Sequence, residues 1–477
     1  MPESRRFVLA IATLWPLVIT APAAAQRGDG GSLPGPRALE TARVGPVPDS
    51  PHRGFWEVLN DSTLNRLMEQ ALRGNYELRA AGARVENAEA ARTQSALDLA
   101  PAVTASAGYT RRRLSSSAFP GTGGATFPSQ DLWDSGLNLS WELDVFGRVR
   151  SGLRAQNALV GAADEDVRNT QVAVAAELAR TYFELRGTQG QLAVARRNAE
   201  NQRRTLELTR TRLEAGRGTE FDTERARAQL NFTLAAIPLL EERIAAAQHR
   251  VGVLVGRSPD ALAAELGTDG SLPALPADVP AMPAEDVVRQ RPDVLSAASR
   301  VAASRSFSRS ARADYLPRLN LAATAGYTAN AVDAFGNTGT FNYNFGPVLS
   351  WAAFDLGRVK ARVDQAQALE LEARARYENT VLLARAELES ATVRYRTARA
   401  RLDHLREAAA ASERAAALAT LRYEGGIDDF LQVLDSERTL LAAQDQLAQA
   451  ETQAADAYVV LYKARGAGWP AEPGRNP

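Results

Sequence analysis

Two segments of the chain gather acidic and basic side chains around a break between helices. Residues 422–441 (RYEGGIDDFLQVLDSERTLL) and residues 212–231 (RLEAGRGTEFDTERARAQLN) share one plan. In each, a helical pattern meets glycine, breaks, passes acidic residues and resumes as a helix. Carboxylates in this pattern can set an electric field that favours cations, and guanidinium groups can form ion pairs with them.

The helix after the second break carries three different side chains on one face. Leu431 lies one turn before Asp435, and Asp435 and Arg438 are spaced i and i+3, so the three form one stripe. Asp428 and Asp429 are turn residues beside it. The alternative for Asp435 and Arg438 is a solvated surface pair that contributes only about a few tenths of a kcal/mol.

The glycines at the breaks have two compatible interpretations. Gly216, Gly425 and Gly426 can be plain helix C-caps. They can also be hinges, because a segment that opens and closes needs a flexible point in its backbone.

Other kinds of functional site find little support. The chain contains no cysteine, which excludes disulfides, thiolate metal sites and cysteine nucleophiles. His52, His249 and His404 lie far apart in the sequence, and none has a helical partner for zinc. There is no phosphate-binding glycine loop, nucleophile elbow or calcium loop. We therefore predict a protein that is not an enzyme and that has neither a cofactor nor a metal.

The charge balance and the N-terminus indicate an exported protein. Lys+Arg and Asp+Glu both number 56, so no net field would recruit nucleic acid. Arg5 and Arg6 precede an apolar run at 7–20, and alanines at 23–25 suit signal peptidase, which predicts a signal peptide at 1–25. No later segment has the ~18 apolar residues of a membrane-spanning helix. Without cysteine, lipid attachment at an N-terminal cysteine is not expected either.

An internal duplication organises the rest of the chain. Residues 141–256 align with residues 351–466 without a gap, and residues 83–101 align with residues 299–317. The first shift, 351 minus 141 or 210 residues, is far too long for a solenoid unit. The predicted organisation is a signal peptide (1–25), an N-terminal extended segment (26–60), a first repeat (61–256), a linker (257–283), a second repeat (284–466) and a C-terminal tail (467–477).

Within each repeat we expect one helix, two strands and then two long helices joined at the glycine break. The first helices are expected at about 61–98 and 284–314. The segment from Gly147 to Gly216 would form roughly 100 Å of helix. Its partner is expected at about 220–254, and the repeat of that partner at about 430–465. A long coiled coil that serves as a scaffold or stalk is the alternative for these helices.

Four segments alternate apolar and polar residues as strands do, at 103–109, 137–144, 319–327 and 341–351. About ten residues suit a tilted membrane crossing whose apolar face meets lipid. Soluble hairpins packed on a core are the alternative. Aromatic residues near the strand ends fit an interfacial girdle. The side chains expected to face lipid are Tyr109, Leu139, Trp141, Tyr327, Tyr343 and Trp351.

The number of strands bears on the assembly. Four strands cannot close a barrel that holds a passage, yet a bilayer tolerates no open sheet edge. If the hairpins enter a membrane, several chains must therefore pool them. Three chains would give about twelve strands, an even number in the range of outer-membrane barrels. The same homotrimer would pool its long helices into a hollow cylinder.

At this point the chain resembles the TolC-type outer-membrane efflux proteins, in the NodT-like branch that serves resistance–nodulation–division pumps. The resemblance covers nearly the whole chain after the signal peptide. Five segments carry it: FWEVLNDSTLNRLMEQALRGNYELRAAGARVENAEA (55–90), WELDVFGRVR (141–150), LPADVPAMPAEDVVRQRPDV (275–294), WAAFDLGRVK (351–360) and YEGGIDDFLQVLDSERTLLAAQ (423–444).

The resemblance implies an α+β membrane channel in which a long α-helical barrel continues into a β-barrel, assembled from a trimer with four strands per chain. It implies a passive exit duct in the cell outer membrane, with the helical barrel in the periplasm. The expected partners are a periplasmic adaptor protein, an inner-membrane pump and outer-membrane lipid, and the cargo is drugs or other small molecules. A duct for type I protein secretion and a soluble periplasmic coiled-coil scaffold are the alternatives. Many members of the branch are lipoproteins, a pattern from which a chain without cysteine departs.

For the glycine-broken turns the resemblance implies a place at the narrow periplasmic end of the cylinder. A threefold axis would turn each carboxylate into a ring of three. Leu431, Asp435 and Arg438 match residues associated with the closed tip, and Asp428 and Asp429 are weaker candidates for the same gate. Gln432 stands where some relatives have a further aspartate.

The first turn differs from the second. Asp222 and Glu224 occupy the comparable region, but Arg217 stands where the second repeat has Ile427. This inequality would allow only the second hairpin to move.

Overall fold

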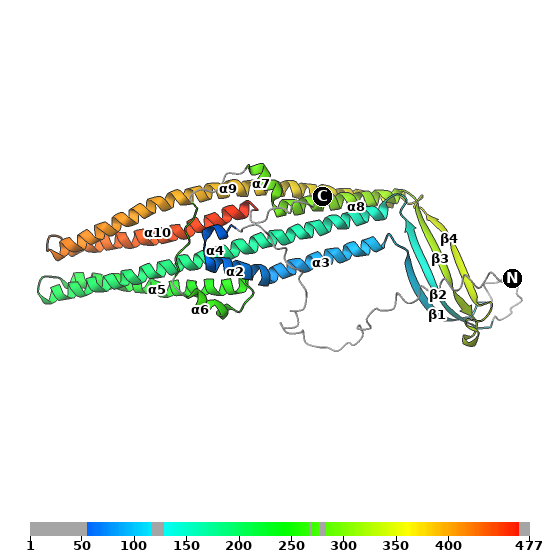
Figure 1. Cartoon of the computed structure of the whole chain (residues 1–477), viewed down its shortest axis with the longest axis horizontal. Coiled ribbons are helices and arrows are strands. Elements are labelled where there is room, and N and C mark those ends of the chain that lie inside the picture. The colour runs from blue at the N-terminus through cyan, green and yellow to red at the C-terminus, as the bar shows by residue number, and fades with distance from the viewer. Residues whose placement is uncertain (1–54, 116–127, 268–269, 277–282, 467–477) are drawn as a thin grey trace. The chain divides into compact units, whose positions relative to one another are not determined.

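The computed structural model describes residues 55–115, 128–267, 270–276 and 283–466 (Figure 1). The predicted signal peptide and C-terminal tail lie outside these residues, as do most of the predicted extended segment and part of the linker. The chain divides into two units, residues 1–45 and 46–477. All described residues belong to the second unit.

Helices make up most of this unit, and the two longest belong to two antiparallel hairpins, α4–α5 and α9–α10 (Figure 1). The predicted long helices are confirmed, and the three for which ends were expected, α4, α5 and α10, lie within a residue or two of them. The helices are α2 (Ser62–Gly74), α3 (Tyr76–Leu97), α4 (Arg148–Glu214), α5 (Glu220–Leu254), α6 (Ala263–Leu266), α7 (Ala284–Gln290), α8 (Pro292–Arg312), α9 (Leu356–Glu424) and α10 (Phe430–Ala464).

The prediction of a single helix at 61–98 is wrong, because the helix is interrupted at Asn75, between α2 and α3. The Asn75 side chain caps α3 by accepting hydrogen bonds from the backbone N–H groups of Glu77 (2.8 Å) and Leu78 (3.1 Å). Its amide nitrogen donates to the carbonyl of Leu254 at the end of α5 (2.8 Å). The break therefore joins α2, α3 and α5 at one point.

The single helix expected at 284–314 is also broken, between α7 and α8. Arg291 is extended, with φ −66° and ψ 133°, and Pro292 begins α8. A residue before proline avoids helical backbone angles, whereas proline is well suited to the first position of a helix. The local sequence thus contains the reason for this break.

The four predicted strands are confirmed and form one antiparallel sheet in the order β1-β2-β3-β4. β2 begins at Gln130, earlier than the expected start at residue 137, and so pairs with β1 along the whole of that strand. The strands are β1 (Ala102–Arg112), β2 (Gln130–Leu143), β3 (Arg318–Ala329) and β4 (Phe341–Ser350).

The register places the alternating residues of all four strands in common rows. One row across the sheet is Val103, Leu139, Ala323 and Phe345, and the next is Thr104, Asn138, Thr324 and Asn344. Because successive side chains point to opposite faces, one face of the sheet is apolar and the other polar.

The apolar face is not covered by the described part of the chain. Val103 is 58% exposed, Phe345 67% and Tyr343 77%. Hairpins packed on a core of their own chain, the alternative left open by the sequence, are not what the described residues form.

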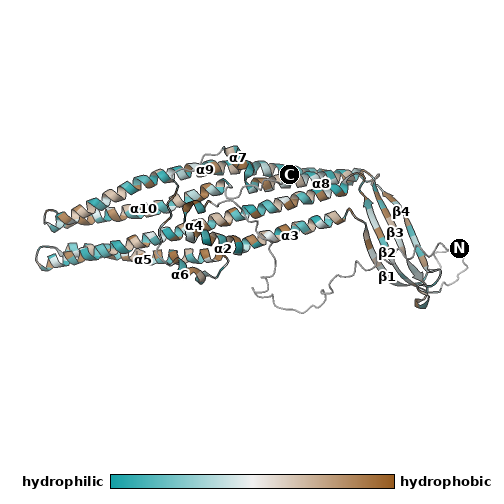
Figure 2. Cartoon of the chain, in the orientation of Figure 1, coloured by the Kyte–Doolittle hydropathy of each residue, from teal (hydrophilic) through white to brown (hydrophobic). Residues whose placement is uncertain are grey.

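The main core lies midway along the helices. It joins α2, α4, α5, α9 and α10 around Tyr182, Phe183 and Tyr458, and Phe55 and Trp56 pack into it. Hydrophobic and hydrophilic residues are mixed along the long helices (Figure 2). Among the described residues, no helix combines the length and the apolar character needed to cross a membrane.

Candidate functional site at the turns of the two helical hairpins

Both turns end their first helix with the same capping motif. Gly216 and Gly426 have left-handed backbones, with φ of +70° and +73°, a conformation that costs other residues roughly 1–2 kcal/mol. Two N–H groups in each turn donate back to the last helical turn, as in a Schellman motif. These bonds, 2.8 to 3.0 Å long, run from Gly216 to Leu213, from Arg217 to Arg212, from Gly426 to Tyr423 and from Ile427 to Arg422.

Gly425 has a different role from the other two glycines. It is the C-cap of α9 with ordinary helical angles, φ −73° and ψ −4°. A Cβ atom there would meet its nearest neighbour at 3.5 Å, an ordinary contact. Of the three glycines singled out in the sequence, two are therefore required by the backbone and Gly425 is not.

The residues at the N-termini of α5 and α10, the second helix of each hairpin, form helix caps. The Asp429 carboxylate accepts a hydrogen bond from the backbone N–H of Gln432 (3.3 Å). In the first turn the Thr219 hydroxyl accepts from the backbone N–H of Asp222 (3.2 Å) and donates to the Asp222 carboxylate (2.7 Å). Asp429 and Asp222 thus stabilise their own helices.

Asp428 forms an ion pair inside the second turn. The Arg422 guanidinium donates two hydrogen bonds to its carboxylate, at 2.6 and 2.9 Å. These hydrogen bonds hold the pKa of Asp428 below its usual value. The pair joins the last turn of α9 to the loop and keeps this carboxylate ionised.

Arg212, which aligns with Arg422 in the repeat, instead reaches the other hairpin. It donates to the carbonyl oxygens of Tyr423 (2.7 Å) and Glu424 (3.2 Å) at the end of α9. Its guanidinium carbon also lies 3.9 Å from the centre of the Tyr423 ring. This contact was not predicted. The alignment of Arg212 with Arg422 was visible in the sequence, but the two arginines have different partners.

The stripe of Leu431, Asp435 and Arg438 lies on α10 as predicted, but its two charged residues form no ion pair with each other among the described residues. Leu431 is 44% exposed and Asp435 is exposed. The Arg438 guanidinium donates to the side-chain oxygen of Gln229 on α5 (3.1 Å). Arg438 therefore connects the two hairpins, while Leu431 and Asp435 face solvent in the single chain.

The opposite face of α10 holds the hairpins together. Phe430, Val433 and Leu434 are buried against residues of α4, α5 and α9. This cluster, the tip core, orients α10 so that Leu431 and Asp435 point away from the packed interior. Its buried members are Ala199, Leu206, Ala226, Leu230, Tyr423, Phe430, Val433 and Leu434.

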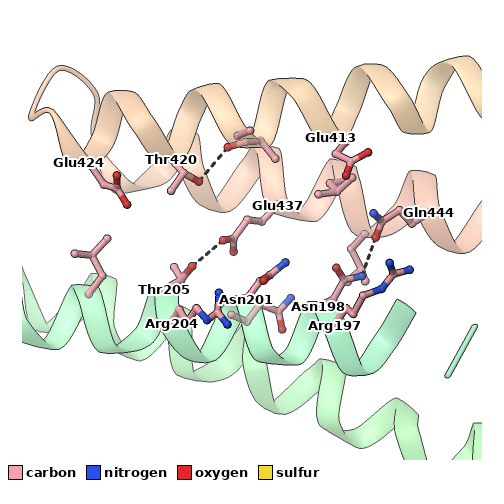
Figure 3. Close-up of a pocket in the computed structure, with 16 residues that line it drawn as sticks. Arg197, Asn198, Asn201, Arg204, Thr205, Glu413, Thr420, Glu424, Glu437 and Gln444 are labelled. Atoms are coloured by element: carbon pink, nitrogen blue, oxygen red, sulfur yellow. Dashed lines mark hydrogen bonds between the residues drawn. The ribbon is translucent and has the colours of Figure 1, made fainter. Parts of the chain in front are cut away.

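Beyond the tip core a groove runs between α4, α9 and α10 (Figure 3). It consists of two cavities of about 500 and 690 Å³ that share Arg197, Glu413 and Gln444. Two hydrogen bonds cross it near the tip: the Thr205 hydroxyl donates to Glu437 (2.8 Å), and the Asn198 amide donates to Gln444 (3.0 Å). Charged and amide side chains alternate with apolar ones along this groove, whereas the buried members of the tip core are all hydrophobic.

The aromatic residues singled out on the strands are largely exposed, Tyr109 at 51%, Tyr327 at 40% and Trp351 at 56%. Trp351 directly follows β4. The two tryptophans have equivalent roles, because each indole N–H donates to a backbone carbonyl in the segment between a helix, α3 or α8, and the strand that follows it. Trp141 bonds to Leu99 (2.9 Å) and Trp351 to Tyr315 (3.1 Å). Their apolar rings thus lie where helix and strand meet.

No group of three or more histidine and acidic residues placed to hold a metal ion occurs in the described ranges.

Comparison with known proteins gives a consistent result over most of the chain. The family described as "Outer membrane efflux protein" matches residues 67–257 and 284–467. The toluene efflux pump outer membrane protein TtgI of Pseudomonas putida is 30% identical over 422 residues, 87% of each chain. The outer membrane protein OprJ of Pseudomonas aeruginosa is 31% identical over 413 residues, 86% of this chain and 85% of OprJ.

Solved structures agree with these relatives. The outer-membrane channel OprN superposes with a TM-score of 0.82 at 39% identity, over 87% of this chain and 92% of OprN.

Proposed function

Because this chain belongs to the outer membrane efflux protein family, we propose that it is the passive exit duct of a tripartite efflux pump in the cell outer membrane. Drugs or other small molecules would enter from an inner-membrane pump through a periplasmic adaptor and leave through the barrel. Relatives named as outer membrane proteins of toluene and solvent efflux pumps support efflux over type I protein secretion.

The observation that carries the proposal is that the sheet of a single chain has two unpaired edges. β1 and β4 are the edge strands of a four-stranded sheet whose apolar face is exposed. In a bilayer each edge must find a partner. A homotrimer would pair β4 of one copy with β1 of the next and close about twelve strands, a size known for outer-membrane barrels.

The same symmetry would assemble the helices. α4 has 67 residues and α9 has 69, so each is roughly 100 Å long at 1.5 Å per residue. Three pairs of hairpins arranged around an axis would form a helical barrel in the periplasm, with the glycine-capped turns at the end remote from the sheet.

We assign the gate of this barrel to Leu431, Asp435 and Arg438, with Asp428 and Asp429 beside them. The open face of α10 supports this assignment, since Leu431 and Asp435 are free to meet their copies around the axis. The Arg438–Gln229 bond supports a closed position in which α10 is held against α5. Gly216, Gly425 and Gly426 would be the hinges.

The groove between α4, α9 and α10 offers a surface for the adaptor. On α9 and α10 its lining positions are one, three or four residues apart, so they lie along one face of each helix, as positions that contact a further helix do. A helical hairpin of the adaptor would fit there. The positions are Arg406, Ala409, Ala410, Glu413, Ala416, Ala417, Thr420 and Glu424 on α9, and Glu437, Leu440, Leu441, Gln444, Leu447, Ala448 and Glu451 on α10.

Membrane fractionation followed by the mass of the purified protein in detergent tests the proposal. We expect the protein in the outer-membrane fraction and a particle of three chains, because only pooled sheets satisfy every strand edge. A water-soluble monomer or dimer would contradict both the duct and the gate.

A further inference from the structure

Glu437 occupies an unusual position for a carboxylate. It lies on α10 between the exposed Asp435 and the tip core, half-buried and facing α4 across the groove (Figure 3). Its one described hydrogen bond comes from the Thr205 hydroxyl on α4, at 2.8 Å. No ion pair reaches it among the described residues. A carboxylate shielded from water and without a cationic partner is costly in its ionised form.

The pocket around Glu437 also contains a buried acceptor that no donor reaches in the described structure. Gln202 is 4% exposed, lines the same pocket, and its side-chain oxygen is buried without a hydrogen-bond partner in the described structure. Gln202 and Thr205 are spaced i and i+3 on α4, so both lie on the side that faces Glu437. An ionised carboxylate can only accept hydrogen bonds, whereas a protonated one carries an O–H that can donate.

The other charged groups around the pocket are balanced or engaged elsewhere. α4 contributes Arg197 and Arg204, and α9 contributes Glu413 and Glu424. Arg204 lies 3.6 Å from Glu200 on its own helix. On α10 the neighbouring guanidinium of Arg438 points to Gln229 of α5. Burial accordingly raises the pKa of the Glu437 carboxyl, and the Thr205 hydrogen bond offsets part of that rise.

We propose that Glu437 is a proton-operated clasp between the two hairpins: in its protonated form it holds α10 against α4, and its ionisation loosens the tip. The proposal rests on the assignment of the tip as the gate and adds a regulation of that site.

The direction of the pH effect follows from the environment of Glu437 when the hairpins are together and when they are apart. When they are together, Glu437 is shielded and binds its proton more tightly than an ordinary glutamate. When they separate, water reaches the carboxyl and its pKa returns toward the usual value of about 4.3. Protons therefore favour the clasped tip, and this contribution is lost as the pH rises through the higher pKa of the clasped state.

The distance between the hairpins measures the clasp directly. The chain has no cysteine, so Glu207→Cys on α4 and Arg414→Cys on α9, both at exposed positions, can be spin-labelled in the full-length protein and diluted with unlabelled chains. We expect the distance between the labels to lengthen as the pH rises, with a midpoint above the ordinary glutamate value of about 4.3.

Three variants separate the clasp from a general pH effect. Glu437→Gln keeps an acceptor for Thr205, supplies a donor and cannot ionise, so it should hold the short distance at every pH. Thr205→Val removes the bond that stabilises the ionised form and should move the midpoint to higher pH. Asp445→Asn, at an exposed position of α10 that does not line the groove, should leave the transition unchanged.

A pH-dependent distance that persists in Glu437→Gln would overturn the proposal, as would a wild-type distance that does not change with pH. Conductance in planar bilayers distinguishes this failure from a failure of the proposed function. A protein that conducts no ions but keeps the pH-dependent distance would refute the duct and leave the clasp intact.

Discussion

At the scale of single residues, the duplicated sequence places equivalent side chains in unequal roles. Arg422 pairs with Asp428 within its own turn, whereas Arg212 spans to the carbonyl oxygens that end α9. The end of a helix carries partial negative charge and unsatisfied carbonyl oxygens. Arg212 is therefore suited to hold the second hairpin against the first. Its counterpart Arg422 pairs with Asp428 in its own turn instead.

Arg212→Met should loosen the end of α9. The substitution removes two hydrogen bonds and the contact with the Tyr423 ring, about 1–2 kcal/mol together. We expect faster hydrogen exchange of the backbone amides in residues 421–428, measured by mass spectrometry. Arg422→Met is the matched control and should have a smaller effect, because the Arg422–Asp428 pair is exposed to solvent. Equal effects of the two substitutions would contradict the role given to Arg212.

Asp435→Ala and Arg438→Ala should each raise passive leakage of large antibiotics through the duct. Arg438→Ala removes a partly exposed hydrogen bond to Gln229, about 1 kcal/mol, which corresponds to roughly a fivefold larger open fraction. Antibiotic uptake in cells without an active pump and single-channel conductance measure the change. Gln229→Leu should reproduce the Arg438 variant, and Asp445→Ala, farther along α10, should not. Unchanged uptake and conductance in both gate variants would refute the gate assignment.

At the scale of elements, the seam between the hairpins depends on how closely α4 and α10 approach. At Gly187 on α4 an added Cβ atom would lie 2.0 Å from the Thr452 hydroxyl oxygen and 3.0 Å from its Cβ atom. That hydroxyl also donates to the Ala448 carbonyl (3.0 Å), so Thr452 cannot turn away without losing a hydrogen bond. At Gly190, one turn along the same helix, an added Cβ meets nothing within 4 Å.

Gly187→Ala should therefore destabilise the protein, by about 1–3 kcal/mol for an overpacked contact. Gly190→Ala should be neutral or stabilising by up to about 1 kcal/mol, since alanine favours helix over glycine. Thermal unfolding followed by circular dichroism compares the two variants. A Gly187 variant as stable as the Gly190 variant would show that α4 and α10 do not cross so closely in the assembled protein.

At the scale of the whole molecule, the alternation of apolar and polar residues along the strands gives the sheet two different faces. Leu139 and Asn138 are neighbours in β2, yet Leu139 lies in the apolar row with Val103, and Asn138 lies in the polar row with Thr104. The Asn138 amide also donates to the Ser106 hydroxyl across the strands (2.9 Å). One position should therefore tolerate charge and the other should not.

Leu139→Lys should reduce the yield of trimer in the outer membrane, because a lysine that faces lipid is destabilising in a membrane barrel, by up to about 2–4 kcal/mol at the bilayer midplane. Asn138→Lys, one residue away on the polar face, should assemble normally. Outer-membrane fractionation and the mass in detergent report both variants. Equal loss of trimer from the two would mean that the apolar face does not meet lipid.

The sequence by itself determined the local features of this protein. Alternation fixed the strands and their faces, glycines placed the turns, and the duplicated pattern predicted the helix pairs. These features depend on residues close together in the chain. The break between α7 and α8 also depends only on neighbouring residues, because Pro292 keeps Arg291 out of the helical conformation. The prediction of one helix at 284–314 did not include it.

Only the tertiary structure decided the contacts between segments far apart in the chain. Asn75 breaks a helix where its amide meets the end of α5, Arg438 bonds to Gln229 instead of Asp435, and Glu437 is shielded because α10 packs on α4. Each depends on which face of one long helix meets another. Helical spacing limits which faces can meet, but burial and the available hydrogen-bond partners determine which of them do.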